Sequence, residues 1–520
     1  MTSLVSHKPD FAAVTRGPGP ATSLRVVREL FAAFHAAGIP YCHWKSNEHL
    51  GRSMSGLADL DVLVEKGRAG VIEQILASNG FKRFTATPLR SYPGIEDYLT
   101  LDDDDTGRLV HLHLHYQLTL GEPFLKGYRL PWEPLLLSTR RMDAEHGIYI
   151  ADANLEFLLV AVRGALKLRL RDMFRMRLGS AFLAELYWLR ERVDPQQVLA
   201  LGEELLGGRV AAPLRALLVN EPSLRLLVSL RRAAAPSLRH HRTYGPLQAR
   251  ARASLREVAS LLTALSRTFL GMALPARRTS PRGGLIVAIL GCDGSGKSSV
   301  VEEVVGSLGR KVDILPIYFG SGDGRSSLVR LPLKLAHKLT RGTVRSRATP
   351  PRVEGQGLEC TPSSYPGNRR SRTLATVIWA LALSHEKRGK LRRAIRARNR
   401  GMIVVCDRLP QNQVMGFNDG PLLARWSNHR AWLPRSLAHW ETTAYERCST
   451  HPPDIVVKLA VSPEVAMARK PDTPAWEVRR RVEAVRQLRF PSTVQVVEID
   501  AEAPLATVCL AVKRMIWRAA

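Results

Sequence analysis

Runs of apolar residues and amphipathic segments alternate over the second half of the chain. The run Leu285–Leu290 has the length of a buried strand, and Val300, Val304 and Leu308 then recur at helical spacing. Further strand-length runs lie at 312–318, 402–406, 454–461 and 494–499, and a long helical pattern lies at 373–400. Strands that alternate with helices are typical of a parallel sheet covered by helices, so an α/β domain is predicted over 285–520.

The first part of the chain has a different pattern. An amphipathic helix is predicted over 22–38, and a strand is predicted at Leu60–Val64. The polar turn residues Asp102–Gly107 precede the alternating sequence LVHLHLHYQL, which begins at Leu109 and predicts a hairpin strand. This combination indicates an α+β domain over 1–150.

Helical periodicity continues from Asn154, with arginine and lysine opposite the apolar positions. Asp194, directly before Pro195, is a predicted helix N-cap. We therefore expect a helical domain over 151–275. In the segment 276–284, proline, glycine, serine and arginine replace the apolar pattern, which predicts a linker.

The charge of the chain is strongly positive. It has 76 lysines and arginines against 47 aspartates and glutamates, which gives a net charge of +29. Such an excess favours phosphate-rich partners, namely nucleotides, nucleic acid or an anionic membrane surface. A solvated arginine-rich surface is the alternative, because no basic run is interleaved with aromatic residues as in a base-stacking platform. Nucleic acid is therefore not the favoured partner.

Cysteine usage and the N-terminus bear on the compartment. The six cysteines are scattered without a C-x-x-C pair, which fits a reducing compartment and gives no zinc or disulfide pattern. The first residues lack the apolar core of a signal peptide, and no stretch approaches about 18 uncharged apolar residues. We expect a cytoplasmic protein without a membrane span.

One motif after the strand Leu285–Leu290 carries clear chemistry. The sequence GCDGSGKSS begins at Gly291 and matches G-x-x-x-x-G-K-S, between a strand and a helix. Glycines let backbone N–H groups point at phosphates, and the helix N-terminus adds to the positive field. The lysine reaches the outer phosphates and the Ser298 hydroxyl binds Mg2+. The predicted ligands are therefore ATP or GTP with Mg2+. The candidate nucleotide-binding residues are Gly291, Asp293, Gly294, Ser295, Gly296, Lys297, Ser298 and Ser299.

Three sequences in this half together support a resemblance. They are GCDGSGKSS, the strand end VVCDR and the stretch PPDIVVKLAVSPEVAMARK. Residues 284–520 resemble the thymidylate kinase family of P-loop kinases. The resemblance implies that Asp293 contacts the acceptor's sugar, Asp407 helps to organise Mg2+ and Arg408 clamps the acceptor phosphate. It places Arg469, Lys470 and the run Arg479–Arg481 in an arginine-bearing lid.

The chain departs from this family on the acceptor side. The family's Arg-Glu-Pro signature is replaced by YFGSGDGRSS, and the stretch after Arg408 reads LPQNQVMGFNDGP. The donor side is intact. The leading hypothesis is therefore ATP- and Mg2+-dependent phosphoryl transfer to a nucleoside monophosphate or another small phosphorylated acceptor, with Lys297, Asp407, Arg408 and Arg469 as the catalytic residues. A homodimer is compatible with this assignment.

A pair of carboxylates marks the N-terminal domain. Asp59 and Asp61 lie two apart at the predicted strand DLDVLV, so they share one face and are candidate metal ligands. The order of helix, WKSN turn and DLDVLV strand resembles the polymerase-beta-like nucleotidyltransferases. That family has a third carboxylate on a later strand, which would fall near His113, where this chain has no acid.

The histidines of the later strand leave several interpretations open. His111, His113 and His115 alternate with leucines and so share one face. In the first interpretation they form a polar sheet face. In the second they bind phosphate or substrate, and in the third they bind a metal opposite Asp59 and Asp61. Two further hypotheses for the whole protein follow: nucleotidyl transfer through Asp59 and Asp61, and a non-enzymatic basic protein whose partner binding is gated by nucleotide.

Overall fold

The computed structural model describes residues 23–520 except 105, 123, 169–177, 270, 321–368 and 415–419. The chain forms two compact units. Unit 1 comprises Met1–Gly271 and Ala276–Pro281, and unit 2 comprises Met272–Pro275 and Arg282–Ala520. The sequence predicts a mobile loop or insert over the Pro-, Gly-, Ser- and Arg-rich stretch 341–370. Its residues 341–368 lie outside the described residues, and the helix α14 (Arg369–Asn399) begins with its last two.

Unit 1 is built on a mixed sheet with the strand order β10-β3-β4-β5-β2-β1-β9-β8. The strands are β1 (Tyr41–His43), β2 (Leu60–Val64), β3 (Lys82–Ala86), β4 (Ile95–Leu101), β5 (Leu109–His115), β8 (Arg141–Asp143), β9 (Ile148–Ile150) and β10 (Arg278–Thr279). A small sheet of β6 (Leu118–Glu122) and β7 (Leu125–Leu130) follows β5. The first helices are α1 (Arg25–Ala36), α2 (Leu50–Met54) and α3 (Ala69–Ser78).

Several predictions of local structure are confirmed in this unit. Helix α1 buries Val27, Leu30, Phe31 and Phe34 and is followed by Gly38 with φ of 59°. Strands β4 and β5 form the predicted hairpin, which the Gly107 N–H closes by donating to the Asp102 carbonyl. Apolar side chains on one face of the sheet and on α1 explain why this region folds together.

Helices of the middle region share a core with this sheet. They are α4 (Glu133–Thr139), α5 (Ala153–Lys167), α7 (Ser180–Arg190), α8 (Pro195–Leu206), α9 (Ala211–Val219), α10 (Leu224–Arg239) and α11 (Pro246–Thr268). Trp44 and Leu63 of the sheet region pack in one cluster with Phe157 of α5 and Leu186 of α7. The predicted N-cap is present, since the Asp194 carboxylate accepts from the Gln196 N–H at 2.9 Å. The helical region is thus part of unit 1.

The segment that the sequence marks as a linker contributes a strand. Arg278 and Thr279 form β10, which pairs antiparallel with β3 through Arg278↔Ala86 and Thr279↔Thr85. A strand of two residues gives no periodicity in the sequence, so it was not foreseen. The segment therefore extends the sheet of unit 1 before the chain continues into Arg282–Ala520 of unit 2.

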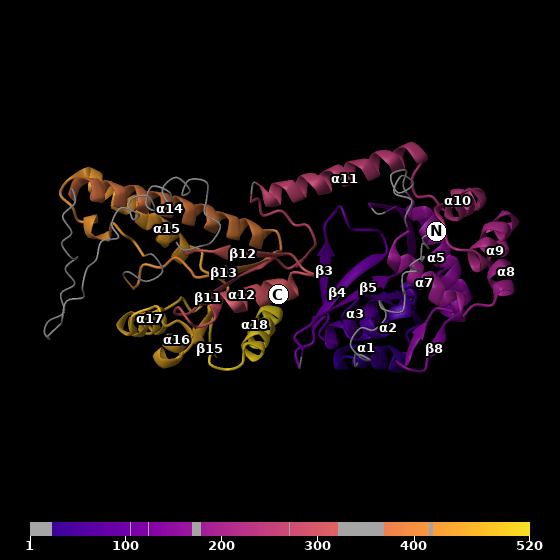
Figure 1. Cartoon of the computed structure of the whole chain (residues 1–520), viewed down its shortest axis with the longest axis horizontal. Helices are drawn as coiled ribbons and strands as arrows, with labels where there is room; N and C mark the ends of the chain where they lie inside the picture. Colours follow the sequence, from indigo (N-terminus) through magenta and orange to yellow (C-terminus); the bar gives the residue numbers. More distant parts are fainter. Residues whose placement is uncertain are drawn as a thin grey trace, which may run out of the picture. The chain divides into compact units, whose positions relative to one another are not determined.

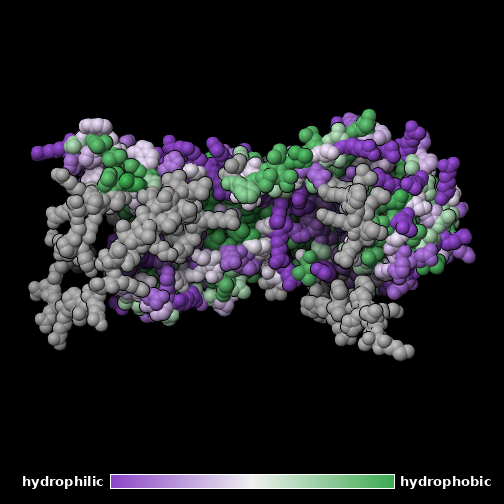
Figure 2. Space-filling view, turned by 45° about the horizontal axis from the view of Figure 1, so that its top comes forward, coloured by the Kyte–Doolittle hydropathy of each residue, from purple (hydrophilic) through white to green (hydrophobic). Residues whose placement is uncertain are grey.

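Helix α11 turns its apolar stripe away from the rest of unit 1. Leu255, Val258, Leu262 and Leu265 recur at helical spacing, and Leu255 is 70% exposed. Figure 2 shows hydrophobic side chains gathered along the surface at this helix. From the opposite side, the Arg256 guanidinium donates to the Phe124 carbonyl at 3.2 Å. The polar side of α11 is thus the side that contacts the rest of unit 1.

Unit 2 is a parallel sheet in the order β12-β13-β11-β14-β15. Its strands are β11 (Leu285–Leu290), β12 (Ile314–Tyr318), β13 (Ile403–Asp407), β14 (Ile455–Ala460) and β15 (Gln495–Asp500), all within two residues of the predicted runs. Its helices include α12 (Lys297–Leu308), α14 (Arg369–Asn399), α15 (Trp432–Thr450), α16 (Pro463–Arg469), α17 (Ala475–Gln487) and α18 (Leu505–Ala519). The predicted α/β organisation of this half is confirmed.

The strand order of unit 2 fixes where a ligand can bind. Helices α14 and α12 lie on opposite sides of the sheet (Figure 1). From β11 the chain goes to β12 and β13 on one side and then crosses to β14 and β15 on the other, so the strand order reverses at β11. Open parallel sheets bind ligands at the carboxyl ends of the strands next to such a switch point. Within the described part of the chain, no helix is long and apolar enough to cross a membrane.

Candidate functional site

The loop between β11 and α12 has a backbone that depends on glycine. Gly294 and Gly296 have φ of 86° and 80°, in the left-handed region that favours glycine. A Cβ on Gly294 would lie 2.5 Å from the Ala466 carbonyl oxygen, and one on Gly291 would collide with the Ser295 side chain. Helix α12 begins at Lys297 without a side-chain cap, so its first N–H groups are available to an anion.

Lys297 is held at the base of this loop. Its Nζ donates to the Cys292 carbonyl at 2.5 Å, and only 6% of the residue is exposed. Burial lowers the pKa of the ammonium to about 8, and the neighbouring Arg408 charge adds to the effect. The loop thus holds a buried cation whose charge is costly until an anion binds beside it.

Asp407 ends β13 beside the loop. Parallel pairing of β11 with β13 sets Ile289 opposite Asp407, which brings the carboxylate to the start of α12. Its Oδ2 accepts from the Ser298 hydroxyl at 3.2 Å, while its Oδ1 is buried without a hydrogen-bond partner among the described residues. A hydroxyl beside an unsatisfied carboxylate oxygen offers the hard oxygen ligands that Mg2+ prefers, so these two residues fit the predicted metal.

The next residue, Arg408, has a constrained backbone. Its φ is 68°, which is rare outside glycine, and its N–H donates to the Ile289 carbonyl at 3.1 Å. Its guanidinium lies 2.9 Å from Asp293 Oδ1. Arg481 of α17 binds the other oxygen of the same carboxylate. One loop carboxylate therefore joins two arginines from different elements.

These residues line one cleft of about 770 Å3. Its walls are formed by Asp293, Gly294, Gly296, Lys297, Ser298, Ser299, Tyr318, Asp407, Arg408, Arg469 and Lys470. Arg469 is oriented by donating to the Ala501 carbonyl at 2.8 Å. The structure thus brings together most of the residues that the sequence places at the nucleotide site, and Gly291 and Ser295 shape the loop beneath them. In the predicted run Arg479–Arg481, Arg481 is the arginine that binds Asp293, whereas Arg479 is exposed.

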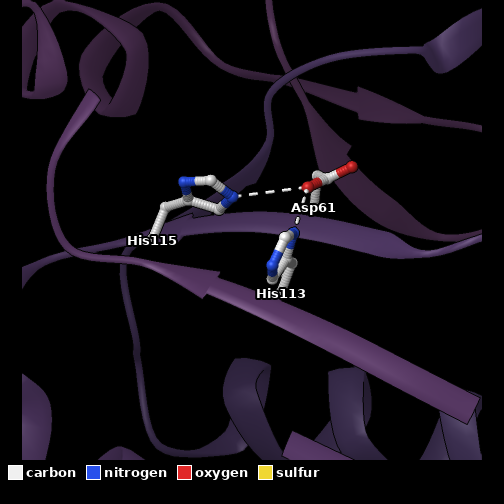
Figure 3. A group of neighbouring side chains, drawn as sticks. All are labelled: Asp61, His113 and His115. Carbon is white, nitrogen blue, oxygen red and sulfur yellow. Dashed lines mark hydrogen bonds and ion pairs between the residues drawn. The ribbon is translucent and has the colours of Figure 1, made fainter. Parts of the chain in front are cut away.

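A second polar site covers one face of the sheet in unit 1. Strand β5 lies between β2 and β4, with His113 opposite Asp61 on one side and opposite Asp97 on the other. His113 Nδ1 lies 3.2 Å from Asp61 Oδ1, and its Nε2 lies 3.1 Å from Asp97 Oδ1. His115 Nε2 lies 3.3 Å from Asp61 Oδ1 (Figure 3). The carboxylates and the imidazole rings therefore alternate across three strands.

Further charged residues complete this site. His111 lies between Asp59 and Asp97, with distances of 3.0 Å from its Nδ1 to Asp59 Oδ1 and 2.8 Å from its Nε2 to Asp97 Oδ1. The Lys45 ammonium lies 2.9 Å from Asp61 Oδ1. Asp59 and Asp61 thus bind different partners, and His113 is the residue near which the resemblance to the nucleotidyltransferases would place a third acid.

Two residues of this site were missed from the sequence. Asp97 is one, although counting back along the hairpin from Leu101↔Leu109 places it opposite His113. Arg278 is the other, and its Nε donates to Asp97 Oδ1 at 2.8 Å from within the expected linker. Burial raises the cost of the Asp97 charge, but its imidazole and arginine partners outweigh that cost and hold its pKa well below the usual range.

A buried carboxylate joins the WKSN turn to the helices. Glu156 of α5 accepts from the Asn47 side chain at 2.8 Å and from the Asn47 N–H at 3.2 Å. Burial raises the pKa of Glu156 to about 8. Glu185 of α7 accepts from the Ser46 N–H at 3.0 Å, and Ser46 has φ of 61°. The turn is therefore fixed by two helices in addition to its own hydrogen bonds between Asn47 and His43.

Two curated proteins of Escherichia coli strain K12 are similar to part of the chain. The uncharacterized ATP-binding protein YghS is 28% identical over 235 residues, which cover 45% of this chain and 93% of YghS. The uncharacterized ATP-binding protein YghR is 26% identical over 231 residues, which cover 43% of this chain and 83% of YghR. No protein-family model matches the chain. The similarity thus extends over nearly the whole of each relative and less than half of this chain.

Proposed function

We propose that the protein binds ATP with Mg2+ and transfers the terminal phosphoryl group to a small phosphorylated acceptor, with a nucleoside monophosphate as the first candidate. The observation that carries this proposal is that Lys297, Asp407 and Arg408 line one cleft at the carboxyl ends of parallel strands. The printed names of YghS and YghR, both ATP-binding proteins, support the nucleotide part of the proposal.

The phosphate loop forms the proposed donor side of the site, where ATP binds. The uncapped start of α12 and the Lys297 ammonium bind the β- and γ-phosphates, because both present positive charge to the same anion. Ser298 and Asp407 Oδ1 hold Mg2+, directly or through water. When bound, Mg2+ neutralises charge on the phosphate oxygens.

The two arginines that bind Asp293 form the proposed acceptor side of the site. A phosphorylated acceptor competes with the Asp293 carboxylate for Arg408 and Arg481, because phosphate binds guanidinium through the same paired hydrogen bonds. An acceptor phosphate oxygen then attacks the γ-phosphorus as the bond to the β–γ bridging oxygen breaks, which leaves ADP. This oxygen is already an anion at neutral pH, so the step requires no general base.

Arg469 and Lys470 supply charge from the opposite wall. Both line the cleft at the end of α16, and Arg469 is positioned by the Ala501 carbonyl. Cations fixed before the reaction stabilise charge that spreads over the transferred group without reorganising, which is the largest contribution that a protein makes to phosphoryl transfer.

An acceptor panel tests this proposal. Full-length protein is incubated with ATP, Mg2+ and single nucleoside monophosphates, and the nucleotides are separated by chromatography. We expect ADP and one phosphorylated acceptor to appear in equal amounts, Lys297→Ala to abolish both products, and Lys311→Ala, outside the cleft, to retain them. ADP formation that no acceptor on the panel increases would count against transfer to a nucleoside monophosphate.

A further inference from the structure

Three potential ligand atoms surround one point on the sheet face of unit 1. Nδ1 of His113 and Nε2 of His115 lie 3.2 Å and 3.3 Å from Asp61 Oδ1. Figure 3 shows the two imidazole rings pointing to this oxygen from successive outward positions of β5. Asp61 and His115 are buried, and the His113 side chain is 21% exposed. The group is therefore reachable from one side and enclosed on the other.

The spacing of these atoms fits ligands of one ion. Bonds of about 2.0 Å from zinc to nitrogen and oxygen place tetrahedral ligands about 3.3 Å apart. Hydrogen bonds from N–H to oxygen are most often about 2.9–3.0 Å long. The two distances at Asp61 are thus at the long end for hydrogen bonds and close to the ligand separation around a small metal ion.

The crowding at Asp61 also favours an ion. Lys45 Nζ lies 2.9 Å from the same Oδ1, so three nitrogen atoms approach one oxygen. A carboxylate oxygen has two lone pairs. A metal ion would take one lone pair and Lys45 the other, while His113 and His115 would turn their own lone pairs toward the ion. Each of the four atoms that meet at this point then has a partner.

The surroundings of His113 match the second shell of a metal site. Metal-bound histidines almost always donate their other ring N–H to a carboxylate, a backbone carbonyl or water. His113 Nε2 lies 3.1 Å from Asp97 Oδ1, and Arg278 Nε donates to that same oxygen at 2.8 Å. The ring is thus oriented by a carboxylate that is itself held in place.

We infer that Asp61, His113 and His115 bind a divalent transition-metal ion of the zinc type. Two imidazoles and one carboxylate suit Zn2+, Co2+ or Fe2+, whereas Mg2+ prefers oxygen ligands. His113 and Asp97 also line a cavity of about 90 Å3 with Tyr92 and Arg90, so the cluster borders a cavity on the Asp97 side of His113. This site differs in ligands and metal from the Mg2+ site at Asp407.

Cobalt binding tests this inference directly. Full-length protein is treated with a chelator, dialysed and titrated with Co2+ in the presence of excess Mg2+, and visible absorption and binding heat are recorded. We expect one equivalent to bind with the visible bands of nitrogen- and oxygen-coordinated Co2+, and Zn2+ to displace it. Absence of saturable Co2+ and Zn2+ binding in the wild-type protein would overturn the inference.

Two ligand variants, one variant of the carboxylate that orients His113 and one control locate the site. His113→Asn and His115→Gln are each expected to weaken Co2+ binding by at least about 100-fold, and Asp97→Asn by about 10- to 100-fold. His146→Gln removes a histidine that pairs with Asp143 elsewhere in unit 1 and should leave binding unchanged. Circular dichroism shows which variants fold, and binding that survives in a folded His113→Asn or His115→Gln protein contradicts the assignment.

The result is independent of the phosphotransferase proposal. Lys297 lies in unit 2 and the proposed ligands lie in unit 1, so Lys297→Ala should bind Co2+ as the wild-type protein does. Loss of phosphoryl transfer with intact Co2+ binding in that variant separates the two sites. Equal loss of Co2+ binding in Lys297→Ala would contradict the assignment to unit 1.

Discussion

The Ser298 hydroxyl donates a hydrogen bond of 3.2 Å to Asp407 Oδ2, which links the first turn of α12 to the end of β13. The other oxygen of Asp407 is buried and has no hydrogen-bond partner in the part of the chain that the structure describes. A buried carboxylate oxygen without a partner is costly, and a metal ion would remove that cost. This pair is therefore the point at which the loop, the sheet and Mg2+ are expected to meet.

Asp407→Asn should separate Mg2+-dependent catalysis from nucleotide binding. The amide keeps an oxygen for Ser298 but lacks the charge that holds the metal, so we expect Mg2+-dependent transfer to fall by at least about 100-fold. Binding of ATP without Mg2+ should change little, as measured by calorimetry. Asp500→Asn, at the end of the edge strand β15 of the same sheet, is the control and should have wild-type activity. Equal losses in the two variants would argue against a metal role for Asp407.

ATP binding should depend on pH through Lys297. The pKa of its ammonium is lowered to about 8 in the free protein, and bound phosphates raise it again. Above pH 8, binding must therefore take up a proton, and the affinity should fall by up to about tenfold for each further pH unit. Calorimetry in buffers of different ionisation enthalpy measures that uptake. Lys297→Arg, which stays charged, should show none; uptake that persists in this variant would assign the proton to another group.

Arg481 and Arg479 lie on the same helix but should differ in effect. Arg481 binds Asp293 in the cleft, whereas Arg479 is exposed on α17. Arg481→Gln should raise the KM for the acceptor and lower kcat/KM by at least about tenfold, because a charge-assisted contact to phosphate is lost. Steady-state kinetics with varied acceptor provide the test. A similar loss in Arg479→Gln would indicate that the charge of the helix matters rather than this contact.

The stability of unit 1 should fall as pH rises through the titration of Glu156. Burial raises its pKa to about 8 in the folded protein. Between the ordinary glutamate pKa and pH 8 the carboxyl is therefore ionised in the opened state but stays protonated in the folded state, which favours opening. Relative to Glu156→Gln, the wild-type protein should lose on the order of 3 kcal/mol of opening free energy between pH 5 and 8.

Hydrogen exchange of α5 amides measures this opening in unit 1, and comparison of the two proteins at each pH cancels the intrinsic exchange rate. The exposed Glu204→Gln variant should show no such trend relative to the wild-type protein. If the difference in opening free energy between the wild-type protein and Glu156→Gln stays constant over this range, the pKa of Glu156 is not raised in the folded protein.

The features predicted from the sequence are those whose parts are close in the chain. The phosphate loop needs only β11, eight motif positions and α12, all within 285–308, so local pattern was sufficient. Asp407 and Arg408 were identified because they end an apolar run, and parallel pairing with β11 then brings them to the loop. The order of the strands was not predicted, because it depends on packing between distant segments.

The features missed are contacts set by tertiary structure. Arg278 reaches Asp97 across 181 positions from a two-residue strand, which leaves no periodic signal in the sequence. Glu156 fixes the Asn47 turn across 109 positions, and a glutamate in an apolar helix does not reveal its partner. Asp97 differs from these, because the hairpin register contained the information that places it beside His113.

The fate of the γ-phosphoryl group of ATP tests the central claim most directly. Full-length protein is mixed with γ-labelled ATP, Mg2+ and the acceptor that the panel identifies, in a single turnover with protein in excess. The account predicts that the label passes from ATP to the acceptor with equal formation of ADP, and that Asp407→Asn slows this transfer. Label that appears only as inorganic phosphate, or that stays on ATP with every acceptor, would contradict it.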